Sequence, residues 1–537
     1  MYKHQFMQDT KPMHNANLGI APQVEKLAES AFSLISRTFP VCSGSDEFYF
    51  FPQAVTENSH WHDWDNFSGE AIAAFLRNLS PIENQLSALQ SRVETREDKI
   101  NLSLLLNSFM SLRTQLVEVA PHRSQPTFHL TVIVAGLTEA LEADDAGLWS
   151  ERVAGVPKFL QQAKDCLHDV PEVFHKLGLD MLADLHHWTI QLAARGFEVA
   201  RLSSALSEFK TALNNLAITS AFQLPKDLLN RLLSDHLGLG IGFEDIRLAL
   251  ENERLQMTEL LDHQANRLAP SKSWQELCRL IPRQPLPENG FLELYHGELR
   301  KLEWHCRDRG MIPKHTPKNA KLEIAVVPPH LATIRASDAY SATPGYPSKG
   351  GKYYIMEPKQ PQDGAAGPTV EYRLTTIHET WPGHHLLDLC RWSLHSPVRR
   401  PLERPLFYEG WACLAEQIMA RSGYLDHPWD HFLLAKRRLE RAVRGLVDLG
   451  LQTGSFCFDQ GRALLVAAGY SPRRADTVIP KYLLRPGYQI CYTLGLKHGL
   501  ALLDQHGGQD LGGFVQRFLG EGEIDFDWMH QIIGLTE

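Results

Sequence analysis

Hydrophobic residues recur every three or four positions along most of the first half of the chain. The pattern runs from about residue 20 to 270 and is clear in segments such as QVEKLAESAFSLISRTF and LTVIVAGLTEALEAD. This spacing places apolar side chains on one face of an α-helix, and the Leu, Ala, Glu, Gln and Arg residues that dominate these segments favour helices. Short loops marked by proline or glycine separate them. The pattern predicts a helical N-terminal region over residues 1–310.

The spacing of hydrophobic residues changes to that of strands near residue 311. The segment 322–327, LEIAVV, and the segment 353–356, YYIM, are short, apolar and rich in β-branched or aromatic residues. Between them, the Gly-, Pro- and Ser-rich segment 341–352 predicts a loop. Helical spacing then resumes and continues along the chain. We therefore expect a mainly α protein whose second region, residues 311–537, contains a small β-sheet.

Composition and charge restrict the class of protein. The chain of 537 residues can bury a large core and is long for one domain. Its 54 Lys and Arg against 63 Asp and Glu give a net charge of −9, which argues against nucleic acid or an anionic membrane as partner. The polar N-terminal segment lacks the apolar core of a signal peptide, and no stretch has the ~18 apolar residues of a membrane helix. We therefore expect a cytoplasmic protein; the oligomeric state is not indicated.

Eight cysteines are scattered along the chain, and none forms a Cys-x-x-Cys pair. Several lie in apolar helical segments, as Cys413 does in the segment WACL. Free cysteine is among the most buried residue types, and disulfides are rare in the cytosol. We interpret the cysteines as reduced, buried thiols rather than as a disulfide framework.

The most informative segment is IHETWPGHH, residues 377–385. In the His-Glu-x-x-His signature of zinc hydrolases, two histidines four residues apart share one face of a helix and bind zinc, and the glutamate between them is the general base. Here His378 and Glu379 fit the signature, but Pro382 occupies the position of the second histidine. Because proline cannot donate a backbone hydrogen bond and clashes with the preceding turn, we expect the helix to widen or break there.

The form of this break decides which histidine joins His378. On an unbroken helix, His385 would return to the same face about 10 Å further along the axis, too far for one zinc ion. Gly383 makes a deformation easier. A loop of two extra residues would bring His384 to the second ligand position, whereas a different break would bring His385. We favour His384 and keep His385 as the alternative.

A carboxylate on a later helix would complete the site. The segment FYEGWACLAE contains Glu409 and Glu416, which lie seven residues apart on one face of the predicted helix. The segment is largely apolar, so each glutamate needs a cation or a hydrogen-bond partner. We predict that Glu409 is the third metal ligand and that Glu416 orients a ligand histidine by a hydrogen bond. The expected cofactor is one Zn²⁺ per chain.

These motifs resemble those of the bacterial family DUF885, which groups with the gluzincin metallopeptidases. The family hallmarks are similar to HExxPGHH, EGWAxYAE and PGQAxxYKxG, and correspond here to residues 378–385, 409–416 and 486–495. The EGWA segment is also similar to the NEGFA segment of gluzincin aminopeptidases, in which the glutamate binds zinc. The resemblance covers mainly residues 320–500. It implies a zincin-like catalytic region over residues 311–537, with the helical N-terminal lobe around a cleft.

Four positions depart from the family pattern. Leu414 stands where the family has Tyr, Tyr488 where it has Gln, Gln489 where it has Ala, and Thr493 where it has Lys. The metal-carrying positions are intact, whereas the third motif is expected to shape the substrate pocket. The departures therefore indicate a substrate preference that differs from the family's.

Together the motifs predict a zinc-dependent hydrolase of amide bonds, and most directly a peptidase acting on short peptides. Glu379 would take the proton of a zinc-activated water and pass it to the leaving amine. Tyr492 would donate a hydrogen bond to the carbonyl oxygen as charge develops on it. Two alternatives stay open: an amidohydrolase or deacylase for a non-peptide amide, and a metal-binding scaffold without catalysis.

Further residues are candidates for contact with the substrate. Tyr488 in the third motif and Tyr354 in the second predicted strand could line the cleft. The basic residues near the third motif that could bind a substrate carboxylate, or form a solvated basic face instead, are Arg485, Lys481, Arg473 and Arg474. Whether a peptide would be cut from its amino or its carboxyl end is not indicated.

Overall fold

The computed structural model describes residues 20–54, 63–143, 145–314, 316–317, 320–328, 331, 337–356 and 367–534. The polar N-terminal segment, which was predicted not to be a signal peptide, lies outside these residues up to residue 19. Within them the protein is mainly helical with two small sheets, as the periodicity predicts. No described helix is both long and apolar enough to cross a membrane.

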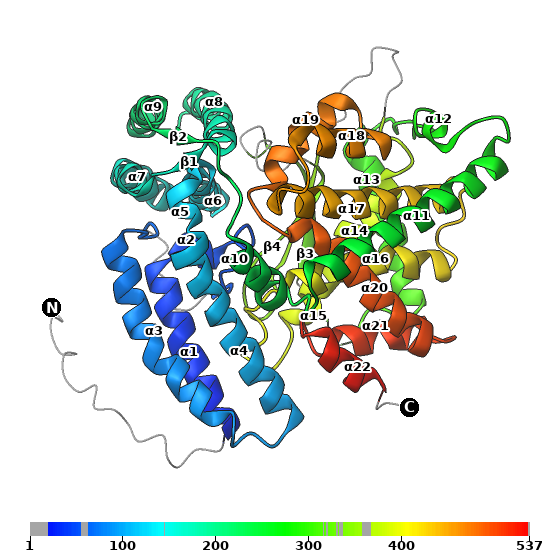
Figure 1. The fold of residues 1–537 in the computed structure, drawn as a ribbon, viewed down its shortest axis with the longest axis horizontal. Helices are drawn as coiled ribbons and strands as arrows, with labels where there is room; N and C mark the ends of the chain where they lie inside the picture. Colours follow the sequence, from blue (N-terminus) through cyan, green and yellow to red (C-terminus); the bar gives the residue numbers. More distant parts are fainter. Residues whose placement is uncertain are drawn as a thin grey trace.

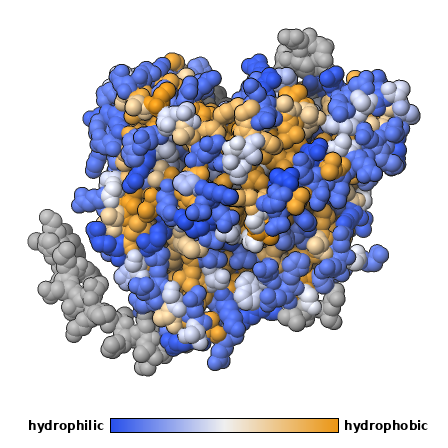
Figure 2. All heavy atoms as spheres, in the orientation of Figure 1, coloured by the Kyte–Doolittle hydropathy of each residue, from blue (hydrophilic) through white to orange (hydrophobic). Residues whose placement is uncertain are grey.

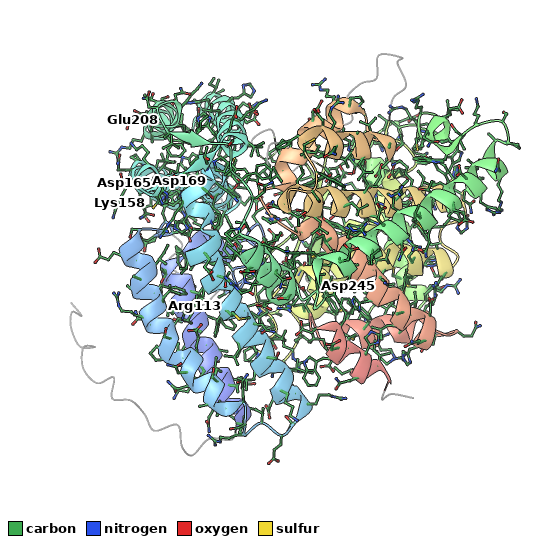
Figure 3. The ribbon with its side chains drawn as sticks, in the orientation of Figure 1. Arg113, Lys158, Asp165, Asp169, Glu208 and Asp245 are labelled. Carbon is green, nitrogen blue, oxygen red and sulfur yellow. The ribbon has the colours of Figure 1, made fainter. Side chains whose placement is uncertain are left out.

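The N-terminal helices pack side by side on one side of the molecule (Figure 1). In α1 the buried Val24, Leu27, Ala31 and Ile35 follow the helical spacing seen in the sequence. Charged side chains on α7 and α9, such as those of Lys158, Asp165 and Glu208, lie on the outer surface (Figure 3). The elements of this part are α1 (Ile20–Thr38), α2 (Pro40–Gly44), α3 (Gly69–Leu89), α4 (Arg96–Thr114), the π-helical η2 (Gln115–Val119), α5 (Pro121–Ser124), α6 (Pro126–Glu142), α7 (Ala146–Cys166), β1 (Val170–Pro171), α8 (Glu172–Ala194), α9 (Ala200–Asn214) and β2 (Ile218–Thr219).

The remaining helices form the other side of the molecule, around the three-stranded sheet (Figure 1). They are α10 (Lys226–Arg231), the π-helical η3 (Leu232–His236), α11 (Phe243–Leu268), α12 (Trp274–Cys278), α13 (Phe291–Asp308), α14 (Tyr372–Glu379), α15 (His384–Arg391), α16 (Pro405–Arg421), α17 (Asp430–Gln452), α18 (Phe458–Ala467), α19 (Pro472–Tyr482), α20 (Tyr488–His506), α21 (Leu511–Leu519) and α22 (Phe526–Gly534). Because α11 packs on α17 and α13 packs on α14, contacts cross the expected boundary at residue 310. The division into two regions stays a prediction.

The three-stranded sheet has the order β3–β5–β4, with β5 parallel to β3 and antiparallel to β4. Its strands β3 (Lys321–Val326) and β5 (Gly350–Ile355) confirm the two predicted strands. The third strand, β4 (Ala339–Ala342), overlaps the start of the segment that was predicted as a loop, and this part of the prediction is wrong. Because β4 is an edge strand, only one side of its backbone pairs with β5. The backbone amide of Tyr340 in β4 bonds instead to the side chain of Glu379, in the first motif.

Helices α16 and α20 approach each other more closely than side chains would allow, because each has a glycine at the crossing. A Cβ atom on Gly410 would lie 2.6 Å from the Gly495 backbone, and a Cβ atom on Gly495 would lie 2.2 Å from the Leu406 carbonyl oxygen. Both glycines belong to the motifs of the sequence analysis. The contact joins the helix that carries Glu409 to the helix that carries Tyr488.

Substitution of Gly495 by alanine is expected to destabilise the protein by about 1–3 kcal/mol, since the added methyl group must push α16 and α20 apart. Chemical denaturation measures this change in the free energy of unfolding. Gly69→Ala is the matched control, because a Cβ atom there meets nothing within 4 Å. Equal stability of the two variants would show that the helices do not need the close contact.

Candidate metal centre

The helix that begins the first motif is interrupted, as Pro382 predicts. Helix α14 ends at Glu379, and α15 begins at His384. A Cβ atom on Gly383 would lie 1.9 Å from the His378 carbonyl oxygen, so only glycine fits this return of the chain. The Trp411 Nε1 donates hydrogen bonds to the carbonyl oxygens of Pro382 and Gly383 at 3.0 and 3.2 Å. The second motif therefore holds the break of the first motif in place.

The break brings three buried side chains together. Ligand atoms of His378, His384 and Glu409 all lie within 4.8 Å of one another. The Glu409 Oε2 lies 3.7 Å from the His378 Nε2 and 3.6 Å from the His384 Nε2. Ligands bound about 2.1 Å from a tetrahedral zinc ion are about 3.4 Å apart, so small movements would suffice to close this group on one ion. The group could therefore bind a metal.

The chemistry of Glu409 fits a cation better than a proton. Its Oε2 is buried without a hydrogen bond among the described residues. Burial raises the pKa of Glu409, but the adjacent imidazoles of His378 and His384 outweigh this effect and hold the pKa well below its usual range. An ionised, buried oxygen that faces two imidazole nitrogens is a suitable ligand for a divalent ion.

The alternative ligand His385 points elsewhere. Its Nδ1 lies 3.3 Å from the Tyr340 hydroxyl, and its ring packs edge-on against Trp381 with 4.7 Å between the centroids. Burial lowers the pKa of His385 to about 3, so the imidazole is neutral. The structure thus brings His384 rather than His385 to Glu409, and His385 belongs to the core.

Glu416 lies beside His378, on the side of the ring that faces away from Glu409. The Glu416 Oε1 is 3.0 Å from the His378 Nδ1. The Arg441 Nη2 also lies 3.2 Å from this nitrogen, but it already donates to Glu416 at 2.6 Å. We therefore assign the carboxylate as the acceptor of the Nδ1 proton, which leaves the His378 Nε2 free to bind a metal. Although burial raises the pKa of Glu416, Arg437 and Arg441 hold it well below its usual range.

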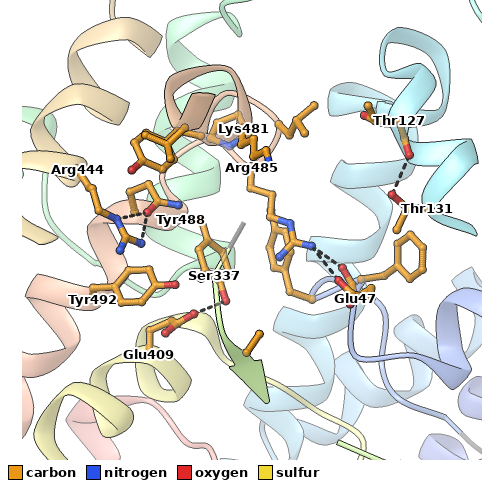
Figure 4. Close-up of a pocket in the computed structure, with 18 of the residues that line it drawn as sticks. Glu47, Thr127, Thr131, Ser337, Glu409, Arg444, Lys481, Arg485, Tyr488 and Tyr492 are labelled. Carbon is orange, nitrogen blue, oxygen red and sulfur yellow. Dashed lines mark hydrogen bonds and ion pairs between the residues drawn. The ribbon is translucent and has the colours of Figure 1, made fainter. Parts of the chain in front are cut away.

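Two tyrosines of the third motif lie next to Glu409. The Tyr488 hydroxyl donates a hydrogen bond to the Glu409 Oε1 at 2.8 Å (Figure 4). The Tyr492 ring is nearly parallel to the His378 ring, with 6.4 Å between the centroids. Tyr488 therefore orients the carboxylate oxygen that does not face the imidazoles.

The Glu379 carboxylate is held by the edge strand. Its Oε2 accepts a hydrogen bond from the Tyr340 backbone amide of β4 at 2.8 Å. Burial raises the pKa of Glu379 to about 7, against the lowering effects of His384 and of the Tyr340 amide. At neutral pH this carboxyl group can therefore both accept and release a proton.

The metal group and Glu379 line a cavity of about 650 Å³. Its walls come from the loop after α2, from η2, α5, α6 and α8, from β4, and from α14–α17, α19 and α20. In the surface view, hydrophobic residues are visible around the hollow between the two sides of the molecule (Figure 2). The lining residues closest to the chemistry are His378, Glu379, His384, Glu409, Tyr488 and Tyr492, and the lining residues with positive charge are Arg444, Arg473, Arg474, Lys481 and Arg485.

Two of the three residues predicted to contact the substrate line the cavity, and the third does not. Tyr488 and Arg485 line the cavity, but the Arg485 Nη2 already donates to the Glu47 carbonyl oxygen at 2.7 Å. Tyr354 is not among the lining residues; its ring is buried, and its hydroxyl donates to Glu142 at 3.2 Å. The burial of Tyr354 and its hydrogen bond to Glu142 therefore do not support the predicted substrate contact.

Sequence reasoning missed the Tyr340 amide, the guanidinium of Arg441 and the guanidinium of Arg444. Both arginines belong to the basic segment KRRLERAVR, residues 436–444, whose charge is typical of a solvated helix face. In fact Arg441 is buried against Glu416, and Arg444 lines the cavity. The apolar residues that interrupt the charges of this segment were the only sign in the sequence that part of it is buried.

Comparisons with known proteins place the chain in a family. The bacterial family of unknown function DUF885 matches residues 168–533. The chain belongs to this family. No curated protein matches it significantly. The DUF885 assignment agrees with the resemblance stated from the three motifs.

Solved structures share the fold of this DUF885 protein at low identity. A "putative lipoprotein" from Colwellia psychrerythraea is 17% identical, with a TM-score of 0.77 over 96% of this chain and 99% of that chain. A "putative lipoprotein of unknown function" from Shewanella oneidensis is 15% identical, with a TM-score of 0.71 over 97% of this chain and 100% of that chain. A carboxypeptidase from Pyrococcus furiosus reaches a TM-score of only 0.40 at 11% identity, over 96% of this chain and 91% of that chain, and carries no argument.

The two lipoprotein descriptions contradict the expectation of a cytoplasmic protein, because a lipoprotein is attached to a membrane by covalently bound lipid. The expectation depended on the polar N-terminal segment, which lacks the apolar core of a signal peptide, and on the lack of a stretch long and apolar enough for a membrane helix. The eight cysteines are nevertheless free, and Cys42, Cys306, Cys390, Cys413 and Cys491 are buried.

A pair of neighbouring substitutions tests the metal group. His384→Gln is expected to lower zinc affinity at least 100-fold, because it removes a nitrogen ligand, whereas His385→Gln should retain wild-type affinity. Zinc titration of the metal-free proteins measures both constants, and thermal unfolding confirms that each variant is folded. The opposite order of affinities would identify His385 as the ligand.

Proposed function

We propose that the protein is a zinc-dependent hydrolase of amide bonds that acts as a peptidase on short peptides. One observation carries the proposal: the buried Glu409 Oε2, without a hydrogen bond among the described residues, faces the Nε2 atoms of His378 and His384. All three side chains line one cavity, together with Glu379. A purely structural zinc site is usually closed by four protein ligands, whereas catalytic sites use three.

The type of ligand favours zinc over other common ions. Magnesium and calcium prefer sites made of oxygen atoms, whereas two imidazole nitrogens and one carboxylate suit zinc. When bound, zinc would polarise a carbonyl group and lower the pKa of a bound water. The Glu416 carboxylate keeps the His378 ring oriented for this role, and Tyr488 does the same for Glu409.

Glu379 is the residue we assign to proton transfer. The Tyr340 amide fixes one of its carboxylate oxygens, and its pKa of about 7 suits a group that takes a proton from water and returns it to the leaving amine. Tyr492 lines the same cavity beside His378 and is the proposed hydrogen-bond donor to the carbonyl oxygen. The volume of about 650 Å³ suits a ligand of a few residues rather than a folded protein.

Glu379→Gln should reduce turnover of short peptides by about 10²–10⁴-fold, because the amide cannot accept the proton. Bound zinc, measured by metal analysis, should remain at one ion per chain. The assay uses a library of tripeptides and tetrapeptides, and Glu208→Gln on the outer surface is the matched control.

The possible outcomes separate the alternatives. Undiminished turnover in Glu379→Gln would remove this residue from the mechanism. A wild-type protein that cannot take up stoichiometric zinc would overturn the whole proposal, and hydrolysis of non-peptide amides alone would identify an amidohydrolase instead.

A further inference from the structure

Arg444 on α17 is a half-buried guanidinium group that lines the cavity. Its Nε donates a hydrogen bond to the Gln489 Oε1 at 2.7 Å, and its Nη2 donates to the same oxygen. The guanidinium also lies over the Tyr492 ring, 4.4 Å from the centroid. Figure 4 shows the group pointing into the cavity above Tyr492. Gln489 thus fixes Arg444 in one orientation.

The charge of Arg444 is not neutralised within the described residues. No carboxylate there comes within 4.0 Å of it, and its hydrogen-bond acceptor is a neutral amide. The neighbouring Asp448 is engaged instead by the backbone amides of Gly487 and Gln489, both at 3.1 Å. A positive charge that is partly removed from water, without a partner of opposite sign, costs free energy that an anionic ligand would recover.

Arg485, the arginine favoured from the sequence, differs in this respect. Its Nη2 donates to the Glu47 carbonyl oxygen, and the Glu47 carboxylate lies 3.9 Å away. The rings of Tyr49 and Tyr488 flank it, each 5.7 Å from the guanidinium carbon. Arg485 therefore links the segment between α19 and α20 to the loop after α2. Of these two arginines, Arg444 is the one whose charge has no carboxylate partner among the described residues.

We propose that Arg444 binds a carboxylate of the substrate, and that the substrates are peptides with a free C-terminal carboxylate close to the bond that is cut. This inference rests on the proposed function. The Tyr492 ring centroid lies 4.4 Å from the Arg444 guanidinium carbon and 6.4 Å from the His378 ring centroid, so the anion site and the metal group border the same aromatic ring. That separation matches a carboxylate in the residue that leaves, rather than one several residues away.

Two positions that depart from the family pattern contact the metal group and Arg444, respectively. Tyr488 donates to the metal-group residue Glu409, and Gln489 accepts from Arg444. An alanine at 489, as in the family pattern, could not make the second hydrogen bond. The orientation of Arg444 is therefore a property of this chain, and it determines which substrates the cavity accepts.

The test compares tripeptides with a free C-terminus against the same tripeptides as C-terminal amides, with zinc-loaded protein. The wild type should favour the free acids by about 10–100-fold in kcat/KM, the range for a charge-assisted hydrogen bond. Arg444→Met should abolish this preference by raising KM for the acids, with little change for the amides. Arg444→Lys should keep part of the preference, and Gln489→Ala should weaken it. Arg462→Met, at a partly exposed arginine that pairs with Asp476 outside the cavity, is the matched control and should retain it.

Binding of N-acetyl amino acids and of their amides, followed by calorimetry, gives a second readout that does not need turnover. The wild type should bind the acids more tightly, and Arg444→Met should not distinguish them. Equal cleavage of acids and amides by the wild type would overturn the inference and leave the proposed function intact. So would loss of the preference in Arg485→Met together with its retention in Arg444→Met. Hydrolysis of neither form would overturn the proposed function, and the binding measurement would then decide on the anion site alone.

Discussion

His378 and His384 belong to two different helices, and the interruption between α14 and α15 is what turns both imidazoles towards Glu409. On a continuous helix, positions six residues apart are separated by about 120° around the axis and by about 9 Å along it, so the two imidazoles could not converge on one ion. The glycine at 383 lets the chain pass within van der Waals distance of its own backbone, and Trp411 fixes the carbonyl groups that the interruption exposes. The same side chain thus satisfies buried backbone groups and connects the first motif to the second.

The second constraint is the glycine contact between α16 and α20. It sets the distance from Glu409 on one helix to Tyr488 on the other. The close packing of the two helices thereby allows the hydrogen bond that orients the Glu409 carboxylate. Two turns further along the same helix, Glu416 connects His378 to the two arginines of α17. The helices α14, α15, α16, α17 and α20 and the edge strand β4 therefore position the site, and none of its side chains depends on a loop alone.

The sequence predicted those features that depend on neighbours along the chain. The mainly α fold, the strands β3 and β5 and the interruption at Pro382 follow from hydrophobic spacing and from the geometry of proline. The strand β4 was missed because four residues beside a Gly- and Pro-rich segment give little signal, and its pairing with β5 is a tertiary contact. To choose between His384 and His385, one must know the direction in which α15 continues after the interruption. The spacing of residues along the sequence does not give this direction. The sequence likewise does not show that Arg444 lacks a carboxylate partner, because six of the nine residues in the segment 436–444 are charged.

One wall of the cavity consists of residues 46–50 and of α6, which precede the segment 168–533 that the family match covers. The metal group, Glu379 and Arg444 all lie inside that segment. Part of the wall around a bound molecule is therefore encoded outside the stretch that carries the reacting groups and Arg444. Amino-acid replacements in the early stretch can reshape the space around a bound molecule while the reacting groups stay as they are, so homologues with identical motifs need not share a substrate.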